Sequence, residues 1–419
     1  MTRDDCLAFD AADPLAPLRD RFSLPEGKIY LDGNSLGVRP RSTAARVARV
    51  VEHEWGEHLI ESWNRAHWIE LPQRVGNKIA RLVGAGPGEL VAADSTSVNL
   101  FKVLWAALSI ANGTPPSRRV ILSERDNFPT DLYIAESIAR ERGCELVLVD
   151  SPQQLKPRLG HGDVAVVMLT QVNYRTGRLH DMADITTAAH DAGTLALWDL
   201  AHSAGALPVH LKRDDADFAV GCGYKYLNGG PGAPAFVWVH PRHAERFWQP
   251  LAGWMGHAAP FAFVPDYQPA PGIARYQCGT PSVIGMAALE CGVDSVLAAE
   301  GLGGMDALRS KSLALTECFM RLVAERCEGH ALTCITPHEA HARGSQVCLA
   351  RAEGAYAIVQ ALIARGVVGD FRAPDVLRFG FTPLYLRFVD VWDAVEHLRQ
   401  VLDTGEWRQP RFHQKAAVT

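Results

Sequence analysis

Residues 198–206 have the sequence WDLAHSAGA, and residues 224–232 have the sequence YKYLNGGPG. Asp199 follows an apolar run, and Lys225 follows a second one, among small residues. A carboxylate that faces a ring cation and a lysine that forms an imine are the two partners that pyridoxal phosphate requires. An Asp and a Lys at this spacing also occur by chance, so the evidence for a cofactor site comes from the sequences around them. Together they predict a flat, aldehyde-bearing cofactor held between Asp199 and Lys225.

Short apolar runs alternate with amphipathic stretches through the middle of the chain. The runs are residues 120–122, 145–149, 164–169, 194–198, 218–221 and 235–239. Helical patterns, such as residues 131–142 and 182–192, separate several of them. Strands separated by helices of this length predict an α/β fold, with a mostly parallel sheet that is covered on both faces. Ligands of such sheets gather at the carboxyl ends of the strands, which is where Asp199 and Lys225 lie.

The pattern changes after about residue 302. A helical pattern is followed by strand-like and helical stretches, at residues 305–326, 331–336, 346–350, 356–365 and 377–381. A chain of 419 residues is also longer than one typical core requires. We therefore predict a large domain over residues 46–300 and a smaller α+β domain over residues 301–419. Residues 1–45 are expected to pack against the smaller domain.

The composition excludes several classes of partner. The net charge is -5 and no run is rich in Lys or Arg, so we expect neither nucleic acid nor an anionic membrane surface as a partner. No apolar stretch approaches the roughly 18 residues that span a bilayer. The start, MTRDDCLAFD, lacks the apolar region of a signal peptide. The nine cysteines are scattered, which predicts reduced thiols and a cytoplasmic location.

No metal site is predicted. His53 and His58 lie five residues apart, and His338 and His341 lie three apart. Neither pair has the four-residue spacing that places two ligands on one face of a helix. Solvated loop or helix surface is the better interpretation of both pairs.

Residues 94–99, DSTSVN, precede a helical run over residues 100–111. Hydroxyls and free N–H groups at a helix start suit a phosphate, and the helix dipole favours one there. An ordinary N-cap needs only one of these residues, so both interpretations stay open. The chain contains neither GxGxxG nor GxxxxGK[ST], so a dinucleotide site and a P-loop have no support.

Three further residues have two interpretations each. Phe128, in NFPTD at 127–131, can lay its ring on a planar cofactor or pack in the core. Asp199 can face a ring cation or cap a helix, and a buried carboxylate needs one such partner. His202 can pack beside a cofactor ring or be an ordinary core histidine.

Several stretches resemble bacterial kynureninases, and they occur in the order of that family. They are YLDGNSLG (30–37), DSTSVNLFK (94–102), NFPTDLYIAE (127–136), WDLAHSAGA (198–206), YKYLNGGPG (224–232), GIARYQCGTP (272–281) and RFGFTPLY (378–385). The resemblance runs from about residue 28 to the C-terminus. It implies the pyridoxal-phosphate-dependent transferase-like fold, fold type I, and homodimers whose active sites form at the subunit interface.

The resemblance also implies roles for individual residues. Lys225 resembles the lysine that forms the Schiff base with pyridoxal 5'-phosphate, Asp199 the partner of its ring nitrogen, and Tyr224 a phosphate ligand and proton relay. The other implied cofactor-binding residues are Thr96, Ser97, Phe128, Pro129, Thr130, Asp131, Thr170 and His202, with Trp254 and Thr280 reaching over from the second subunit. Arg378 resembles the residue that receives the substrate carboxylate, a task that suits a guanidinium. The further candidates for substrate binding are Asn34, Ser35 and Trp63.

The reaction implied by the resemblance is hydrolysis of L-kynurenine to anthranilate and L-alanine, a step of tryptophan catabolism that also serves NAD biosynthesis. 3-Hydroxykynurenine is expected to be a poorer substrate. One alternative is a cysteine desulfurase or class V aminotransferase of the same fold. A desulfurase needs a mobile Cys, whereas Cys348 lies in an apolar strand pattern and Cys327 and Cys334 flank a turn. A second alternative, a cofactor-sensing regulator, would need a DNA-binding module for which neither end has the basic charge.

Overall fold

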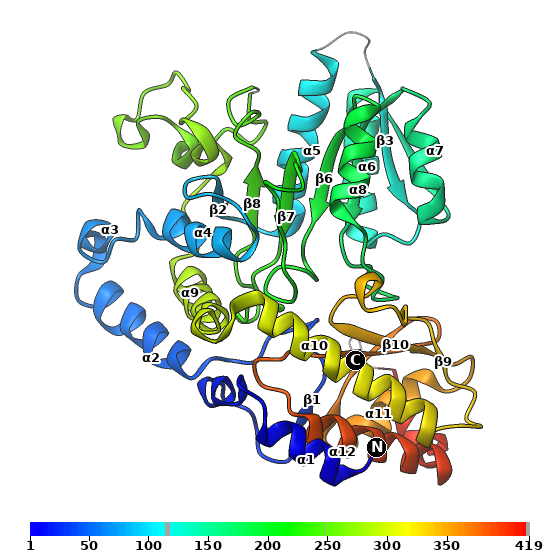
Figure 1. The fold of residues 1–419 in the computed structure, drawn as a ribbon. Helices are drawn as coiled ribbons and strands as arrows, with labels where there is room; N and C mark the ends of the chain where they lie inside the picture. The colour runs from blue at the N-terminus through cyan, green and yellow to red at the C-terminus, as the bar shows by residue number, and fades with distance from the viewer. Residues whose placement is uncertain (114–117, 247, 416–419) are drawn as a thin grey trace.

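The computed structural model describes residues 1–113, 118–246 and 248–415. It contains a seven-stranded sheet in the upper half of Figure 1 and a four-stranded sheet in the lower half. The strand order of the larger sheet is β2-β8-β7-β6-β5-β3-β4. Its strands are β2 (Leu90–Ala92), β3 (Val120–Glu124), β4 (Glu145–Val149), β5 (Val164–Thr170), β6 (Leu195–Asp199), β7 (Phe218–Gly221) and β8 (Phe236–Val239).

The larger sheet is mostly parallel, as the sequence predicts. β4, β3, β5, β6 and β7 run in one direction. β8 is antiparallel to β7, and β2 is antiparallel to β8. β2 therefore runs in the same direction as β7, and its carboxyl end lies at the same edge of the sheet.

Alternate residues of each strand enter two different cores. Leu197 of β6 and Val237 of β8 pack in the core that includes α5 (Thr96–Asn112) and α6 (Pro129–Arg142). Their neighbours Trp198 and Phe236 pack in the core on the opposite face, which includes α8 (Met182–Asp191) and α9 (Val283–Leu297). This alternation follows from the two-residue period of a strand. It explains why the strands are apolar throughout, because both faces are covered.

The smaller sheet is antiparallel and has the order β12-β13-β10-β9. Its strands are β9 (Thr333–Cys334), β10 (Gln346–Ala350), β12 (Asp370–Arg372) and β13 (Val376–Gly380). It lies with helices α10 (Gly304–Arg326), α11 (Ala355–Ala364) and α12 (Phe388–Asp403) in the lower half of Figure 1. The remaining helices are α1 (Arg3–Ala11), α2 (Arg41–Arg49), α3 (Ser62–Arg65), α4 (Leu71–Leu82) and α7 (Leu155–Leu159).

The N-terminal segment contacts both parts of the molecule. α1 packs against α12, and the Asp10 carboxylate accepts hydrogen bonds from the backbone N–H groups of Phe388 (2.6 Å) and Val389 (3.0 Å). β1 (Ile29–Tyr30) pairs with β11 (Val367–Val368), whereas α2 packs on α9. The domain boundaries at residues 45 and 300 stay a prediction.

The predicted strands 145–149, 218–221 and 346–350 coincide with β4, β7 and β10, and the others differ by one or a few residues at their ends. β2 was not predicted, because a strand of three residues leaves too short an apolar pattern. Within the described residues, no helix combines the length and apolarity needed to cross a membrane.

Candidate active site

The carboxyl ends of five strands deliver side chains to one edge of the larger sheet. β6 ends at Asp199 and β5 ends at Thr170, and these two residues are direct neighbours in the sheet. The segments that follow β2, β3 and β7 contribute Thr96, Phe128 and Lys225. Parallel strands place such residues together although they are far apart in the sequence.

These segments enclose a cavity of about 270 Å³. It is lined by Thr96, Ser97, Phe128, Thr130, Asp131, Thr170, Tyr174, Asp199, Ala201, His202, Tyr224 and Lys225. The sequence predicts all of these residues except Tyr174 and Ala201. Tyr174 follows the end of β5, so its position after a parallel strand was the signal that could have identified it.

Lys225 is half-buried and faces aromatic rings. Its Nζ lies 5.8 Å from the centre of the Phe128 ring and 5.7 Å from that of Tyr224. Among the described residues, no carboxylate lies within ion-pair distance of this amine. The backbone around it is tightly packed: Gly37 N–H donates to the Tyr224 carbonyl (2.8 Å), and a Cβ at position 37 would lie 2.3 Å from the Lys225 carbonyl oxygen. The N-terminal segment thus fixes the turn that carries this lysine.

Two buried carboxyl groups, Asp131 and Asp199, lie next to each other in the cavity. Burial and the neighbouring charge of Asp199 raise the pKa of Asp131 well above its usual range. Burial also raises the pKa of Asp199, but the charge of Lys225 and a hydrogen bond from the Ala201 N–H (2.7 Å) oppose that rise. The hydrogen bond from the Ala201 N–H stabilises the ionised form of Asp199, whereas the neighbouring charge of Asp199 favours the protonated form of Asp131.

Two polar atoms at the cavity are buried without a hydrogen-bond partner: Oγ1 of Thr96 and Nδ1 of His202. Ser95 caps α5, because its hydroxyl accepts a hydrogen bond from the Val98 N–H (3.3 Å). The Thr96 hydroxyl is therefore not needed as a helix cap. Burial and the charge of Lys225 lower the pKa of His202, whose Nε2 lies 3.2 Å from the Asn34 carbonyl oxygen. A neutral His202 with Nε2–H as donor presents Nδ1 as an unsatisfied acceptor. Neither atom has a partner among the described residues, so each is available for a hydrogen bond to a polar ligand.

A second group of predicted residues adjoins the cavity without lining it. The Arg378 guanidinium donates from Nη1 to the Tyr174 carbonyl (3.0 Å) and from Nη2 to the Ser35 hydroxyl (2.7 Å). The Tyr174 ring packs edge-on against Phe128, with 5.3 Å between the ring centres. Through Tyr174, and through the Asn34 contact to His202, this group is connected to the cavity.

The remaining predicted residues lie elsewhere in the chain. Pro129 is the first residue of α6. Trp63 and Trp254 pack edge-on with 6.4 Å between their ring centres, and Thr280 is exposed beside a separate hollow. The single chain therefore does not bring Trp63, Trp254 and Thr280 to the cavity.

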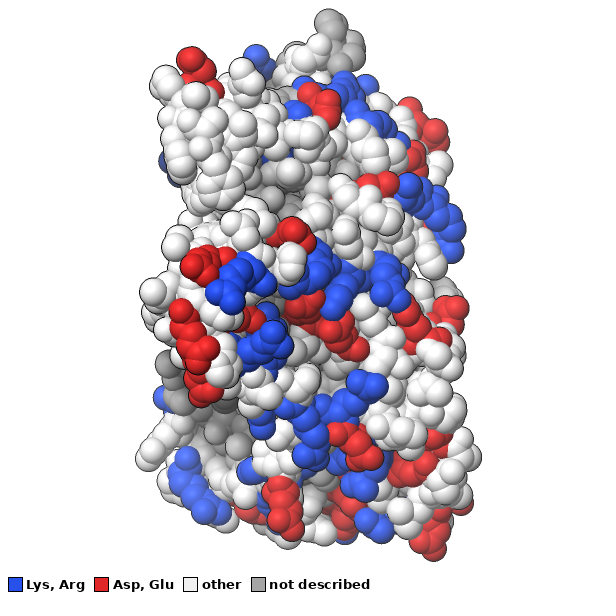
Figure 2. All heavy atoms as spheres, turned by 90° about the vertical axis from the view of Figure 1, so that its left-hand side faces the viewer, with Lys and Arg blue, Asp and Glu red and all other residues white. Residues whose placement is uncertain are grey.

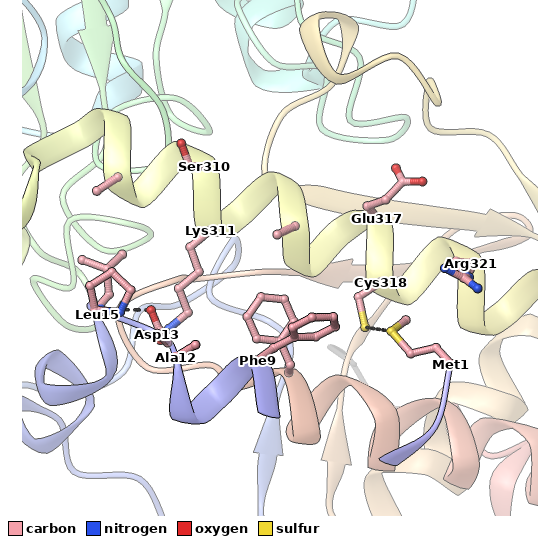
Figure 3. Close-up of a pocket in the computed structure, with 14 residues that line it drawn as sticks. Met1, Phe9, Ala12, Asp13, Leu15, Ser310, Lys311, Glu317, Cys318 and Arg321 are labelled. Atoms are coloured by element: carbon pink, nitrogen blue, oxygen red, sulfur yellow. Dashed lines mark hydrogen bonds and ion pairs between the residues drawn. The ribbon is translucent and has the colours of Figure 1, made fainter. Parts of the chain in front are cut away.

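A larger cavity of about 600 Å³ lies between α1 and α10 (Figure 3). Its lining is mainly apolar and includes Phe9 and Phe388. It also contains a lysine, but the Lys311 ammonium is paired with Asp13 at 2.7 Å. Lys225 is therefore the better candidate for covalent attachment of a ligand.

The cysteines of the C-terminal third are not poised to react. Cys348 is buried in β10, and burial raises its pKa to about 12. Burial also raises the pKa of Cys327 to about 12. A thiol with so high a pKa carries little thiolate at neutral pH. These residues do not supply the nucleophile that a desulfurase requires.

Known proteins are similar to this chain in sequence over its whole length. The sequence is 56% identical over 420 residues to a kynureninase of Burkholderia pseudomallei (strain 1106a) and 55% identical over 420 residues to one of Pseudomonas fluorescens, with 100% of both chains covered in each case. The family model of the kynureninase C-terminal domain matches residues 308–398.

Among solved structures, the apo structure of a cysteine desulfurase from Thermococcus onnurineus NA1 is similar, with a TM-score of 0.77. The two chains are 17% identical, and the match covers 93% of this chain and 98% of the other. At this identity the likeness concerns the fold alone. It confirms the predicted fold type I architecture and adds no support to a desulfurase reaction.

Proposed function

Because the chain belongs to the kynureninase family, we propose that its cavity hydrolyses the Cβ–Cγ bond of L-kynurenine and releases anthranilate and L-alanine. The observation that carries this proposal is the meeting of three groups at one sheet edge: a buried carboxyl pair, and a lysine and a Thr hydroxyl that have no ion-pair or hydrogen-bond partner among the described residues. These are the groups that an aldehyde, a ring cation and a phosphate would need.

The cofactor of the proposal is pyridoxal 5'-phosphate. Lys225 would hold its aldehyde carbon, Asp199 its ring nitrogen, and Phe128 the face of its ring. Thr96, Ser97 and the N-terminus of the 17-residue helix α5 would hold the phosphate. When bound, this cofactor supplies an aldehyde that links to an amine and a protonated ring that withdraws electrons. The unsatisfied Thr96 hydroxyl and the Asp199 charge fit both ends of such a molecule.

The residues of the chain would then move protons. Lys225 Nζ removes the proton from Cα of the substrate, water adds to the γ-carbonyl carbon, and the Cβ–Cγ bond breaks. Tyr224 donates a proton to Cβ, and Lys225 returns one to Cα, so that the three-carbon fragment leaves as L-alanine. Burial raises the pKa of Tyr224, so its hydroxyl is protonated and can serve as a donor. Arg378 binds the substrate carboxylate, with Asn34 and Ser35 beside it.

We propose a homodimer in which each subunit completes the site of the other. Trp254 contacts Trp63 and Phe261, which links two exposed apolar segments on one side of the molecule. Their most exposed side chains are Trp55 (57%), Leu59 (59%), Ile60 (76%), Trp248 (60%), Phe261 (56%) and Phe263 (78%). Figure 2 faces this side, where mostly uncharged atoms cover the upper left and charged side chains lie at the upper right and over the lower part. Exposed aromatic and aliphatic side chains that gather on one side of a molecule are typical of a protein interface, and a second copy of the chain is their proposed cover.

A cytoplasmic location belongs to the same proposal. All nine cysteines are described, and none of them forms a disulfide with another. Six of them are buried, as Cys6 and Cys348 illustrate. Unpaired thiols are typical of a reducing compartment.

The test is a product assay with the purified protein loaded with pyridoxal phosphate. L-Kynurenine should give anthranilate, seen by its fluorescence, and L-alanine in equal amounts, and 3-hydroxykynurenine should be turned over more slowly. Lys225→Ala should lose both turnover and the visible absorption band of the lysine-bound cofactor, because no other unpaired lysine lines the cavity. Retained turnover in this variant would refute the role of Lys225. Release of sulfide from cysteine at a comparable rate would favour the desulfurase alternative instead.

A further inference from the structure

Three charged residues surround the guanidinium of Arg378 and form a cluster of four with it. Asp370 and Arg378 lie directly opposite each other on the antiparallel strands β12 and β13. Both are buried, and Arg378 Nη2 forms an ion pair with Asp370 Oδ2. Arg372, on the same face of β12 as Asp370, pairs with the same oxygen atom at 2.6 Å. Asp32 of the N-terminal segment is the fourth member.

The orientation of Arg378 depends on few contacts. Tyr174 holds Nη1, whereas Nη2 is shared between Asp370 and the Ser35 hydroxyl. Ser35 also donates to Asp370 Oδ2 (3.2 Å), so Asp370 is the common anchor of the guanidinium and of the hydroxyl beside it. The Nε of Arg378 is buried and has no partner, which leaves a donor available to a ligand.

The charges of the cluster decide whether Arg378 still attracts an anion. Asp370 alone would neutralise Arg378. Arg372 is 35% exposed and shares the charge of Asp370, so two guanidiniums face one buried carboxylate. While Asp32, the fourth member, is protonated, the two guanidiniums outnumber the ionised carboxylates of the cluster, and Arg378 is well suited to bind a substrate carboxylate in a fixed geometry.

We propose that Asp370 is a positioning residue for Arg378, and that Arg372 offsets the charge of Asp370 so that Arg378 keeps its attraction for the carboxylate of the substrate. This inference rests on the proposed function, in which Arg378 receives the carboxylate of L-kynurenine. Asp370 pairs with Arg378, and Arg372 pairs with Asp370, so both act on the substrate through Arg378.

The experiment compares a ligand with a carboxylate and one without. The KM and kcat for L-kynurenine are measured together with the Ki of kynuramine, the decarboxylated analogue, as a competitive inhibitor. Asp370→Ala should raise the KM about 10-fold, which corresponds to about 1.4 kcal/mol, and leave the kcat and the Ki of kynuramine nearly unchanged. If net charge alone mattered, removal of Asp370 would instead lower the KM. The direction of the change therefore separates positioning from simple attraction.

Two more variants complete the test. Asp370→Asn keeps an acceptor oxygen and should give a smaller rise in KM, and it replaces Asp370→Ala if that variant does not fold. Arg372→Gln should also raise the KM for L-kynurenine, because Asp370 then neutralises Arg378. The matched control is Asp375→Ala, which removes the neighbouring Arg175–Asp375 pair (2.7 Å) and should change none of the constants.

Three results would overturn the inference. They are an unchanged or lowered KM in the Asp370 variants, an equal rise in the Ki of kynuramine, and an effect of the same size in Asp375→Ala. Failure of the proposed function is recognised separately, because the unmodified protein would then release no anthranilate from L-kynurenine.

Discussion

Lys102 and Lys311 are buried and Lys225 is half-buried, and the partners of these three lysines differ. Lys102 is paired with Asp94 and donates to the Tyr276 carbonyl (2.5 Å). Lys311 is paired with Asp13. Lys225 is the member of this set that has no carboxylate within ion-pair distance among the described residues. An amine that keeps its lone pair accessible is what covalent chemistry with an aldehyde requires.

Asp32 makes the carboxylate site sensitive to pH. Burial and the charge of Asp370 raise the pKa of Asp32 to about 7, against the opposing charges of Arg378 and Arg372. Below this pH Asp32 is protonated and the arginines outnumber the ionised carboxylates, whereas above it the charges balance. The KM for L-kynurenine should therefore rise between about pH 6 and about pH 8, by up to about tenfold.

The control for this prediction is Asp32→Asn, whose side chain stays neutral. In this variant the pH-dependent rise in KM should be much smaller, because the cluster keeps its excess positive charge at every pH. Groups of the substrate titrate equally in both proteins and cancel in the comparison. Steady-state KM values measured over this pH range check the prediction, and an identical rise in the variant would count against it.

At the scale of elements, the start of α5 divides two tasks between adjacent residues. Ser95 caps the helix, whereas the Thr96 hydroxyl is buried without a partner. Ser95→Ala should lower the free energy of unfolding by about 1 kcal/mol and leave cofactor affinity nearly unchanged. Thr96→Val should leave the free energy of unfolding nearly unchanged and weaken pyridoxal phosphate binding about tenfold.

Thermal unfolding and a titration of the cofactor-free protein with pyridoxal phosphate measure the two effects. Equal losses of affinity in Ser95→Ala and Thr96→Val would mean that the phosphate is not held by the Thr96 hydroxyl. Unchanged affinity in both variants would have the same meaning.

The sequence predicts elements well where their pattern is long. β5 and β7 are buried on both faces of the sheet, so their residues form continuous apolar runs. Such runs can be recognised as strands from the sequence alone. β2 is too short for such a pattern, and its pairing with β8 joins segments that are far apart in the chain. Whether Ser95 or Thr96 caps α5 also depends on one side-chain contact, which a sequence pattern does not specify.

Residues that meet through tertiary contacts were harder to find. The resemblance identifies Arg378, but Tyr174 and Asp370, which hold it, lie in segments whose patterns show only a loop and a short strand. Their roles appear only when β13 is placed beside the end of β5. Trp63, Trp254 and Thr280 stay predictions, because the single chain does not bring them to the cavity, and only Trp254 and Thr280 are predicted to reach the site of a second copy.

At the scale of the whole molecule, a site shared between subunits predicts that two inactive variants regain activity when they form a mixed dimer. Lys225→Ala and the double variant Trp254→Ala/Thr280→Ala should each be nearly inactive. In a mixed dimer, one of the two sites would combine an intact Lys225 with an intact Trp254 and Thr280. Co-expression with random pairing should therefore restore about one quarter of the activity of the unmodified enzyme.

Separate expression followed by mixing without subunit exchange is the control for complementation, and it should restore nothing. A lack of recovery in dimers shown to contain both chains would contradict the shared site. It would leave Trp254 and Thr280 without the role assigned to them.

The central claim is the covalent link between the cofactor and one lysine. The most direct measurement is borohydride reduction of the protein loaded with pyridoxal phosphate, followed by mass spectrometry of its peptides. The account predicts that the reduced cofactor is found on the peptide that contains Lys225, at about one per chain. Finding it mainly on Lys102, Lys311 or a surface lysine, or on no lysine at all, would contradict the account.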